Sequence, residues 1–181
     1  MSNEKFQQYL LEDVWLAAGL SGKVLLKGLA LSVSQTELVS VIGPSGGGKT
    51  VLMKLMAGLW APMRGKCLFR GEDIYEAIRA RNAPFRRLVG MTFQRGGLFD
   101  FLNAYDNLDF PLREVTSSSA KDRALMIREA FSDVGLSGQE GLFPHEMSGG
   151  MQKRLSLARA MVLLPSVMLY DDPTAGLDPV T

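Results

Sequence analysis

Short apolar runs separated by polar turns fill the first forty residues of the chain. Residues 8–42 contain several such runs, with turn-forming residues at 19–22 and at 34–36. This spacing is typical of short β-strands joined by tight turns. The last run, residues 38–42, is apolar and β-branched, and it leads directly into a glycine-rich loop. We therefore expect a strand at residues 38–42.

A helical pattern follows the glycine-rich loop. From residue 50 to residue 59 the apolar residues recur every three or four positions, which predicts a helix with one buried side. The residues on that side are Leu52, Leu55, Met56 and Leu59. The pattern thus predicts a strand, a glycine loop and a helix in succession.

The middle of the chain alternates between apolar runs and loops. Residues 67–69 and 88–93 are short apolar runs that predict two further strands. Residues 94–119 contain a glycine pair, two asparagines and a proline, so we expect this segment to be loop-rich.

The last third of the chain predicts two helices and a strand. Ser119 and Asp122 resemble a capping box, and the helix that they open should run to Val134, where Gly135 ends it. A second helix is expected at 149–163, before a proline. Apolar residues 167–170 then predict a buried strand that ends in two carboxylates. Strands that alternate with helices indicate an α/β fold with a parallel sheet.

Composition and charge exclude several classes of protein. Apolar residues make up 46% of the 181 residues, and the formal net charge is +1. The chain therefore has enough apolar content for a folded core and no broad basic surface for nucleic acid. The single cysteine, Cys67, cannot form an internal disulfide and fits a reducing compartment. Because no apolar stretch reaches about 18 residues, a role at a membrane would require docking on another protein.

The glycine-rich loop matches the complete phosphate-binding pattern G-x-x-x-x-G-K-[ST]. Its glycines allow consecutive backbone N–H groups to converge on phosphate oxygens at a helix N-terminus. The lysine should reach the β- and γ-phosphates, and the threonine hydroxyl should bind Mg²⁺. The residues of this loop are Gly43, Pro44, Ser45, Gly46, Gly47, Gly48, Lys49 and Thr50.

A second phosphate-binding pattern opens the helix predicted at 149–163. It consists of Ser148, Gly149 and Gly150, flanked by Met147 and Met151. A nucleotide has one triphosphate, and one loop is enough to hold it. The second helix start therefore indicates that this chain serves a nucleotide bound by another copy, as in a two-subunit ATPase.

Two acidic residues follow the last predicted strand. In P-loop enzymes the carboxyl end of such a strand carries the carboxylate that organises Mg²⁺, and Asp171 stands there. Because side chains alternate along a strand, Asp172 should face the attacking water instead. Lys153, Arg154 and Arg159 lie near helical spacing and are expected to form a solvated helix face.

These motifs together resemble the ATP-binding-cassette (ABC) ATPase family over almost the whole chain. Residues 147–151 are similar to the family signature, Gln94 to the Q-loop glutamine, 170–174 to the Walker B end and 175–178 to the D-loop. The resemblance implies a P-loop NTPase fold with an N-terminal antiparallel β layer and a RecA-like core, within 1–93 and 163–181. It also implies a helical subdomain at 94–162, all within one domain.

The resemblance implies specific roles and partners. ATP and Mg²⁺ would be the cofactors, Lys49, Gln94 and Asp172 the catalytic residues, and Thr50, Gln94 and Asp171 the metal site. The partners would be a second copy, paired through the nucleotide sites, and an integral-membrane permease, with no nucleic acid. The protein would lie on the cytoplasmic face of the inner membrane.

A finer resemblance is to the ATPase subunit of MCE-type (Mla-like) lipid transporters. Residues 93–99, residues 106–114 and the methionine at 151 carry it. It implies phospholipid transport and an MCE-domain partner. The apolar stretch 98–110 follows Gln94, where the family contacts the permease, so we expect docking there, with packing in the core as the alternative.

The chain departs from the family pattern at three places that matter. Asp172 stands where most members have a longer glutamate as the catalytic base. No aromatic residue stands clearly at the adenine-stacking position; Trp15 is the nearest, and packing is an equal interpretation. The chain ends at Thr181, before the expected switch histidine and last strands of the family, and His145 is not that switch.

Alternative functions remain open from the sequence. An ABC transporter for an amino acid, a metal chelate or a drug would carry the same motifs. Non-transport ABC ATPases usually have coiled coils, zinc modules or tandem cassettes, and none is visible here. A GTPase would need an Asn-Lys-x-Asp motif, which the sequence lacks.

Overall fold

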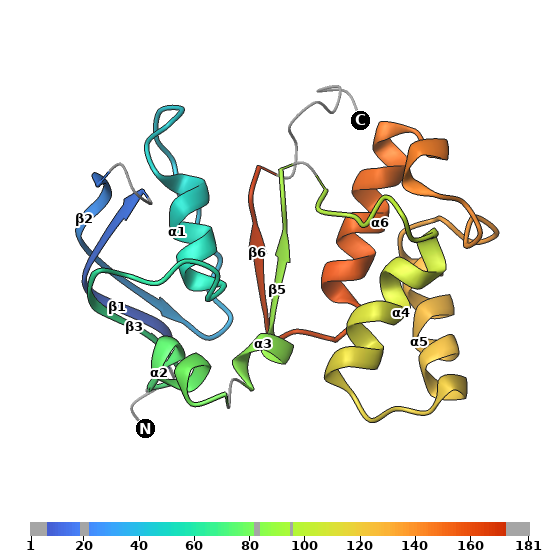
Figure 1. The fold of residues 1–181 in the computed structure, drawn as a ribbon, viewed down its shortest axis with the longest axis horizontal. Coiled ribbons are helices and arrows are strands. Elements are labelled where there is room, and N and C mark those ends of the chain that lie inside the picture. The colour runs from blue at the N-terminus through green and yellow to red at the C-terminus, as the bar shows by residue number, and fades with distance from the viewer. Residues whose placement is uncertain (1–6, 19–21, 82–83, 95, 173–181) are drawn as a thin grey trace. The chain divides into compact units, whose positions relative to one another are not determined.

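The computed structural model describes residues 7–18, 22–81, 84–94 and 96–172. The chain divides into two compact units, residues 1–86 and residues 87–181. Figure 1 labels most of the helices and strands of both units. Each unit has its own sheet and its own helices.

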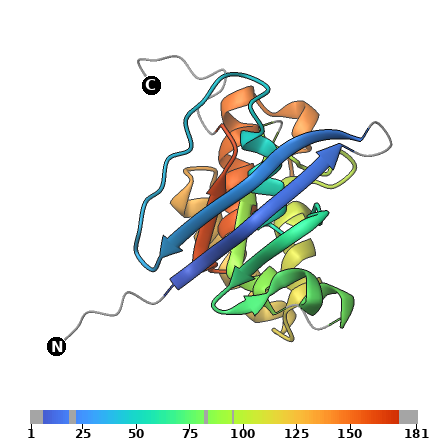
Figure 2. The same cartoon turned by 90° about the vertical axis from the view of Figure 1, so that its left-hand side faces the viewer.

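The first unit is built on an antiparallel sheet with strand order β2-β1-β3-β4. Figure 2 faces this sheet, with the two long strands crossing it diagonally. The result confirms the strands expected before residue 35 and at 67–69. The strands are β1 (Gln7–Ala18), β2 (Lys23–Ser34), β3 (Arg64–Phe69) and β4 (Glu72–Asp73).

Alternate residues of β1 form one side of the core of this unit. Their partners are the apolar side chains of α1 (Lys49–Met56), α2 (Ile74–Arg79) and the start of α3 (Phe85–Leu88). The side chain of Asp73 caps α2 by accepting the N–H groups of Tyr75 and Glu76. The buried apolar residues of the unit are Tyr9, Leu11, Val14, Leu16, Leu26, Leu52, Leu55, Met56, Cys67, Phe69, Ile74, Tyr75 and Phe85.

Two buried tyrosines, Tyr9 in β1 and Tyr75 in α2, bind carbonyls at the end of α1. The Tyr9 hydroxyl donates to the Met56 carbonyl at 3.0 Å, and the Tyr75 hydroxyl donates to the Leu55 carbonyl at 2.6 Å. The first bond satisfies a carbonyl at the helix C-terminus, and the second adds to the bond that the Leu55 carbonyl accepts from the Gly58 N–H. Burial raises the pKa of both tyrosines, and it raises the pKa of Cys67 to about 12. All three groups therefore stay protonated at neutral pH.

The helix expected at 50–59 ends earlier than the sequence pattern indicates. It stops at Met56, because Gly58 adopts a left-handed conformation with φ of 71° and the chain turns there. Leu59 lies beyond this turn and is 54% exposed, so its expected place on the buried side of the helix is wrong.

The strand expected at residues 38–42 is also wrong. The structure has no regular element there, and Leu38 and Ile42 are each 92% exposed. A β-strand needs a pairing partner, and no strand among the described residues pairs with this segment. An apolar, β-branched run indicates that a segment suits a sheet, but it does not supply the neighbouring strand.

The second unit contains a short parallel sheet, β5 (Val89–Thr92) beside β6 (Val167–Tyr170). The register pairs Val89 with Val167 and Thr92 with Tyr170, so both strands end at the same edge. A Cβ on Gly90 would lie 2.5 Å from the Ala160 carbonyl oxygen, so glycine is needed for the close approach of the helix containing Ala160. The strand positions agree with the sequence. However, only Leu169 of β6 is buried, so the expectation of a wholly buried strand is wrong.

Three helices form the apolar core of the second unit. They are α4 (Ala104–Val115), α5 (Ala120–Asp133) and α6 (Gly149–Met161), with the short η2 (Pro144–Glu146) before α6. Ser119 caps α5 by accepting the Asp122 N–H at 3.2 Å, which confirms the expected helix start. The core residues are Ala104, Leu108, Leu112, Ile127, Phe131, Leu136, Met147, Leu155, Ala158 and Val162.

Helix α4 occupies 12 residues of the segment 94–119, and the described residues on either side of it are irregular, as a loop-rich segment predicts. Asn103, read as a turn residue, caps the helix by accepting the Asp106 N–H at 2.7 Å. Asn107 is fully buried, and its amide bonds the backbone of Phe99 and Leu102. Pro111 lies inside the helix. Residues that usually mark turns here cap a helix and tie it to the segment before it.

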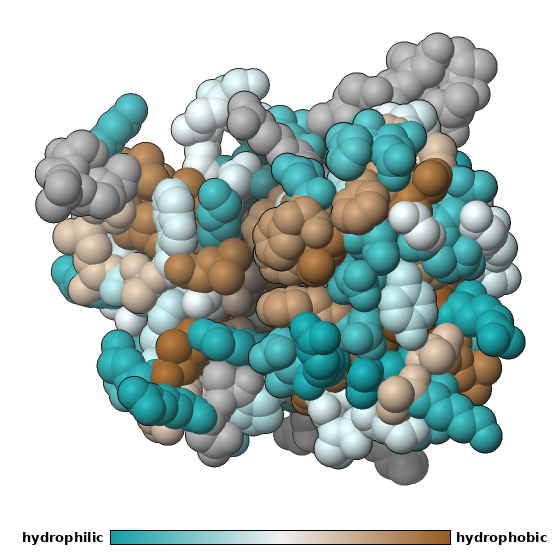
Figure 3. All heavy atoms as spheres, turned by 45° about the vertical axis from the view of Figure 1, so that its right-hand side comes forward, coloured by the Kyte–Doolittle hydropathy of each residue, from teal (hydrophilic) through white to brown (hydrophobic). Residues whose placement is uncertain are grey.

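Apolar side chains reach the surface in patches between hydrophilic ones, as one face shows in Figure 3. The most exposed aromatic side chain of the second unit is that of Phe101, at 76% among the described residues. None of the described helices is both long enough and apolar enough to cross a bilayer.

Candidate functional site

The glycine loop before α1 is shaped by backbone conformation. Gly46 and Gly48 have φ of 77° and 89°, in the left-handed region that favours glycine. A Cβ on Gly48 would lie 3.2 Å from the Leu25 carbonyl oxygen, so this position is also sterically closed to larger residues. Gly48 is the N-cap of α1 and has no side chain to accept the first-turn N–H groups. The start of α1 is therefore suited to an anionic ligand as its cap.

Lys49 lies folded into this loop. Its Nζ donates to the carbonyls of Gly43 and Pro44, both at 2.8 Å. The Gly47 N–H closes the loop by donating to the Pro44 carbonyl at 3.1 Å. Thr50 follows in the first turn of α1. The structure thus brings the ammonium group and the glycine backbone together in one loop, where both can bind phosphate.

The second glycine-rich helix start opens α6. Ser148 is its N-cap, and the Ser148 hydroxyl accepts the Met151 N–H at 3.3 Å. A Cβ on Gly149 or Gly150 would meet nothing within 4 Å. No contact within the described chain therefore requires glycine at these two positions. Glycine is present there even though alanine favours a helix more. Bare backbone at a helix start leaves room for a ligand or another molecule to approach closely.

The carboxyl ends of β5 and β6 carry the remaining polar residues of the site. Asp171 is buried, and its N–H donates to the Thr92 carbonyl at 3.3 Å. Asp172 is exposed and has φ of 52°, a left-handed conformation that aspartate tolerates better than most residues. The two carboxylates thus differ in burial, and their separate roles stay a prediction.

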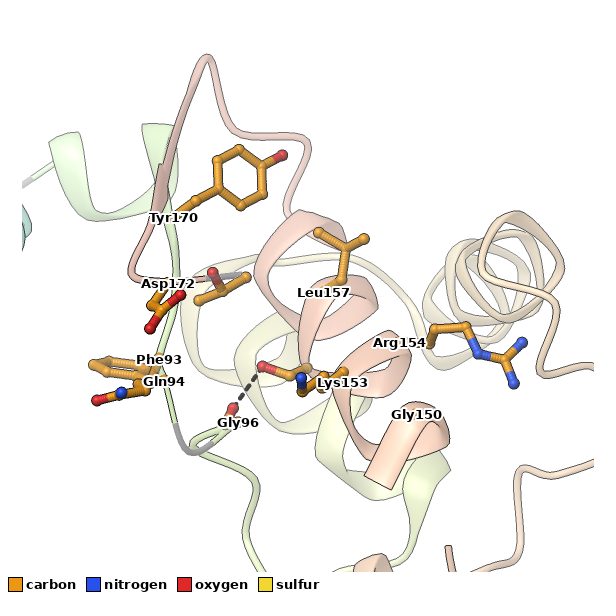
Figure 4. Close-up of a pocket in the computed structure, with 11 residues that line it drawn as sticks. Phe93, Gln94, Gly96, Gly150, Lys153, Arg154, Leu157, Tyr170 and Asp172 are labelled. Carbon is orange, nitrogen blue, oxygen red and sulfur yellow. Dashed lines mark hydrogen bonds between the residues drawn. The ribbon is translucent and has the colours of Figure 1, made fainter. Parts of the chain in front are cut away.

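A pocket of about 330 Å³ connects this sheet edge to α6. Gln94, Asp172 and Gly150 line it together with Phe93 and Lys153. Figure 4 shows Gln94 and Asp172 on the same side of the pocket, at the ends of the two strands. The structure therefore places the expected glutamine and the expected base close to one opening, beside the helix that begins at Ser148.

A profile of the ABC transporter family matches residues 26–175. The chain belongs to the ABC transporter family. The matched range contains both glycine-rich helix starts, Gln94 and the two aspartates.

Curated relatives agree with this assignment. The chain is 38% identical over 171 residues to the intermembrane phospholipid transport system ATP-binding protein MlaF of Escherichia coli, covering 94% of this chain and 63% of MlaF. It is 45% identical over 152 residues to the probable ribonucleotide transport ATP-binding protein Mkl of Mycobacterium leprae, covering 84% and 44% of the two chains. It is 41% identical to the chloroplastic protein trigalactosyldiacylglycerol 3 of Arabidopsis thaliana, covering 93% and 50%. The chain thus spans about half of the length of these relatives.

Solved structures support the same fold. The ATP-binding cassette MJ0796, in a dimeric post-hydrolysis state bound to ADP and Pi, superposes with a TM-score of 0.86 at 27% identity, covering 95% of this chain and 77% of that one. Membership of the ABC transporter family thus rests on sequence and on backbone geometry alike, and it confirms the P-loop ABC ATPase architecture.

The oxygen donors of the family site suit Mg²⁺. The residues that the sequence predicts for the metal site are Thr50, Asp171 and Gln94, each of which carries a side-chain oxygen, and their role stays a prediction. Within the described ranges no group of three or more histidine, cysteine or acidic residues forms a cage for a metal. A site with few protein ligands, all oxygen, is typical of Mg²⁺ bound together with nucleotide phosphates.

Two arginines of α6 form hydrogen bonds that the sequence did not predict. Arg154 donates to the carbonyls of Val134 and Gly135, and Arg159 donates to the Gly97 carbonyl. Arg154 is exposed, as expected for a solvated helix face, whereas Arg159 is partly buried, so the expectation is wrong for Arg159 alone. The Thr92 hydroxyl is buried without a hydrogen-bond partner among the described atoms. Helical spacing alone does not indicate contacts with irregular segments.

Trp15 lies among charged side chains. Its indole N–H donates to Asp13 Oδ1 at 2.8 Å, and Lys27 and Arg64 lie 5.6 and 6.0 Å from the ring centroid. This arrangement agrees with surface packing, and adenine stacking stays a prediction. The D-loop residues 175–178 lie outside the described residues.

Proposed function

We propose that the chain is the ATP-binding and ATP-hydrolysing part of a membrane ABC transporter. The observation that carries this proposal is the loop 43–50, where left-handed glycines, a helix start without a side-chain cap and Lys49 converge. Such a loop binds the phosphates of a nucleotide. The family to which the chain belongs supports the coupling of this binding to transport.

The residues would divide the work as follows. Backbone N–H groups of the loop and the Lys49 ammonium bind the β- and γ-phosphates. Thr50 and Asp171 would hold Mg²⁺, with Gln94 as a further oxygen donor, and the bound ion would supply neutralisation of phosphate charge. The Asp172 carboxylate, exposed at the edge of the pocket, orients the attacking water and accepts its proton.

Asp172→Asn tests this assignment. Asparagine also tolerates the left-handed backbone, so the change removes the negative charge and leaves the conformation intact. We expect hydrolysis to fall by about 10²-fold, the magnitude typical of losing a general base, while ATP binding persists. Phosphate release and nucleotide binding are measured in parallel on the full-length protein. Asp133→Asn, in α5, is the matched control. Full activity of Asp172→Asn would rule out Asp172 as the base.

The second helix start would complete the nucleotide site of another copy. Ser148, Gly149 and Gly150 present open backbone, while the loop 43–50 already suffices for one triphosphate. The dimeric state of the superposed cassette MJ0796 supports a homodimer that forms around the nucleotides.

The substrate of the transporter is proposed to be a phospholipid. Two relatives, MlaF and trigalactosyldiacylglycerol 3, have lipid terms in their names, and the name of MlaF specifies phospholipid transport. The resemblance of residues 93–99 and 106–114 to MCE-type systems supports an MCE-domain partner and a permease in the inner membrane. The ATPase would bind the cytoplasmic face of that permease. A second candidate is a ribonucleotide, because the relative Mkl bears that name at 45% identity.

The permease contact can be tested at Phe101. Phe99 packs against the rings of Phe101 and Phe110, at centroid distances of 5.6 and 5.2 Å, so changing Phe99 would disturb the fold. Phe101 is largely exposed and can be changed alone. We expect Phe101→Asp to weaken binding to the permease by about tenfold, as loss of an aromatic anchor does, and to leave nucleotide binding intact.

The experiment pulls down the co-expressed permease and follows a labelled phospholipid in proteoliposomes. Leu125→Asp, on the exposed side of α5, is the control. Equal loss of nucleotide and permease binding in Phe101→Asp would favour packing in the core. Transport of a ribonucleotide instead of the lipid would favour the second candidate.

A further inference from the structure

Helix α6 holds the turn that contains Gln94. The Gly96 N–H donates to the Phe93 carbonyl at 2.8 Å, which closes a turn around Gln94 at the end of β5. The Ser156 hydroxyl donates to the Gly96 carbonyl at 2.5 Å, and the Arg159 guanidinium donates to the Gly97 carbonyl. Figure 4 shows the bond from α6 to Gly96 as a dashed line. Two consecutive carbonyls are therefore bound by one helix.

The two donors lie on one face of α6. Positions 156 and 159 are three residues apart, so their side chains are neighbours on the helix surface. Gly96 and Gly97 have φ of 74° and 64°, a pair of left-handed residues that lets both carbonyls be bound from the same helix. A Cβ on Gly97 would lie 2.7 Å from the Phe93 ring, so this position admits only glycine without a shift.

Arg159 is held by the Phe99 ring as well as by the Gly97 carbonyl. Its guanidinium carbon lies 4.2 Å from the centroid of the Phe99 ring, and burial lowers the pKa of the group. Arginine nonetheless stays charged at neutral pH. Among the described residues no carboxylate forms an ion pair with it, so the aromatic face and the Gly97 carbonyl compensate its charge.

Helix α6 also carries the glycine-rich start at Ser148. Its 13 residues are continuous, and Leu155 and Ala158 anchor it in the core. At a rise of about 1.5 Å per residue, Ser156 lies about 12 Å from Ser148 along a rigid rod. A movement of the helix start is therefore transmitted to Gly96 and Gly97.

We propose that Ser156 and Arg159 are positioning residues that fix Gln94 relative to the phosphate-binding start of α6. The inference rests on the proposed function, in which Gln94 serves the nucleotide bound with Lys49 and Ser148 serves the nucleotide of the partner copy. Closure of one nucleotide site then sets the position of the glutamine in the other. Neither Ser156 nor Arg159 touches the nucleotide.

A double-mutant cycle on the full-length protein tests the inference with MgATP. Arg159→Met should lower kcat about tenfold with KM within about twofold, because it disturbs chemistry rather than binding. Ser156→Ala should lower kcat less, about threefold, because it removes one neutral hydrogen bond. In a Gln94→Ala background, each change should lower kcat by less than about twofold, since coupled residues are not additive. Arg159→Lys, which keeps the charge, should recover part of kcat.

Arg154→Met is the matched control. It removes hydrogen bonds of 3.0 and 2.9 Å from the same helix to the carbonyls of Val134 and Gly135, away from Gln94. Its effect on kcat should be equal with and without Gln94. Thermal unfolding of every variant separates loss of fold from loss of positioning, and Ser156→Ala serves if Arg159→Met fails to fold.

The outcomes are distinct. An inactive wild-type protein would overturn the proposed function, and this inference with it. In the other case the wild type is active, and the Ser156 and Arg159 changes lower kcat by the same factor with and without Gln94, as Arg154→Met does. That result would overturn the positioning role alone.

Discussion

The two glycine-rich helix starts differ in what completes them. At α1 the N-cap is Gly48, which is left-handed and has no side chain to accept first-turn N–H groups. At α6 the N-cap is Ser148, whose hydroxyl already accepts the Met151 N–H. The first start is therefore open to an external anion, while the second is closed in part by its own side chain.

The segments around the two helix starts also differ in how they pack. The segment that leads into the first loop pairs with no described strand, and Leu38 and Ile42 are exposed. Helix α6 is anchored by Leu155 and Ala158 in the core of its unit. The first start thus follows an exposed segment and is held by hydrogen bonds within its own loop. The second presents a preformed surface, which suits a role in closing on a nucleotide that is already bound.

The largest expected effect concerns Lys49, which has no counterpart at the second start. Lys49→Ala should lower hydrolysis by about 10²-fold or more, by analogy with losing one preorganised donor to transition-state charge. Steady-state phosphate release from the full-length protein measures it. Lys54→Ala, on the same helix with its ammonium over the Trp60 ring at 4.8 Å, is the control. Unchanged turnover of Lys49→Ala at saturating ATP would show that the two starts do not differ as proposed.

Mixing two defective proteins tests whether the second start acts on another copy. Lys49→Ala and Ser148→Glu each disable one half of a composite site. Random pairing of equal amounts should restore about a quarter of the wild-type rate, because about half of the dimers then have one intact site of two. Each variant alone is the control. Absence of rescue, while both proteins still dimerise with ATP, would place both starts on one nucleotide.

Local signals were sufficient for many parts of this structure. The start of α5 at Ser119 was predictable because capping is a matter of adjacent residues, and the left-handed glycines of the first loop were predictable from the spacing of the motif. The end of β6 just before Asp171 and Asp172 was predictable from the apolar run that precedes them. Each of these features depends on neighbours in the sequence.

Features that depend on distant partners were not predictable in the same way. Residues 38–42 have strand composition but lack a pairing strand among the described residues. Asn107 and Pro111 suggested loop, yet they lie in α4, because the buried Asn107 amide bonds the backbone of the preceding segment. The contact of Arg159 with Gly97 joins residues 62 positions apart and leaves no local signal.

The smallest expected effect separates the two starts through a single methyl group. Gly149→Ala meets open space within the chain, and alanine favours a helix over glycine by up to about 1 kcal/mol. The variant should therefore unfold at the same temperature or up to about 2–4 °C higher. Gly48→Ala should instead lose stability, because Gly48 has φ of 89° and its added Cβ lies 3.2 Å from the Leu25 carbonyl oxygen.

A glycine-to-alanine change should lower hydrolysis without lowering the unfolding temperature only at the second start. If the phosphate of a partner's nucleotide approaches the Gly149 backbone, the added methyl group should lower hydrolysis by about threefold to tenfold, which corresponds to about one hydrogen bond. Thermal unfolding and phosphate release on the same samples measure both quantities, with Gly141→Ala, also in open space, as the control. A more stable Gly149→Ala variant with full activity would mean that no ligand reaches the backbone of α6 at Gly149, and the two helix starts would then share no common function.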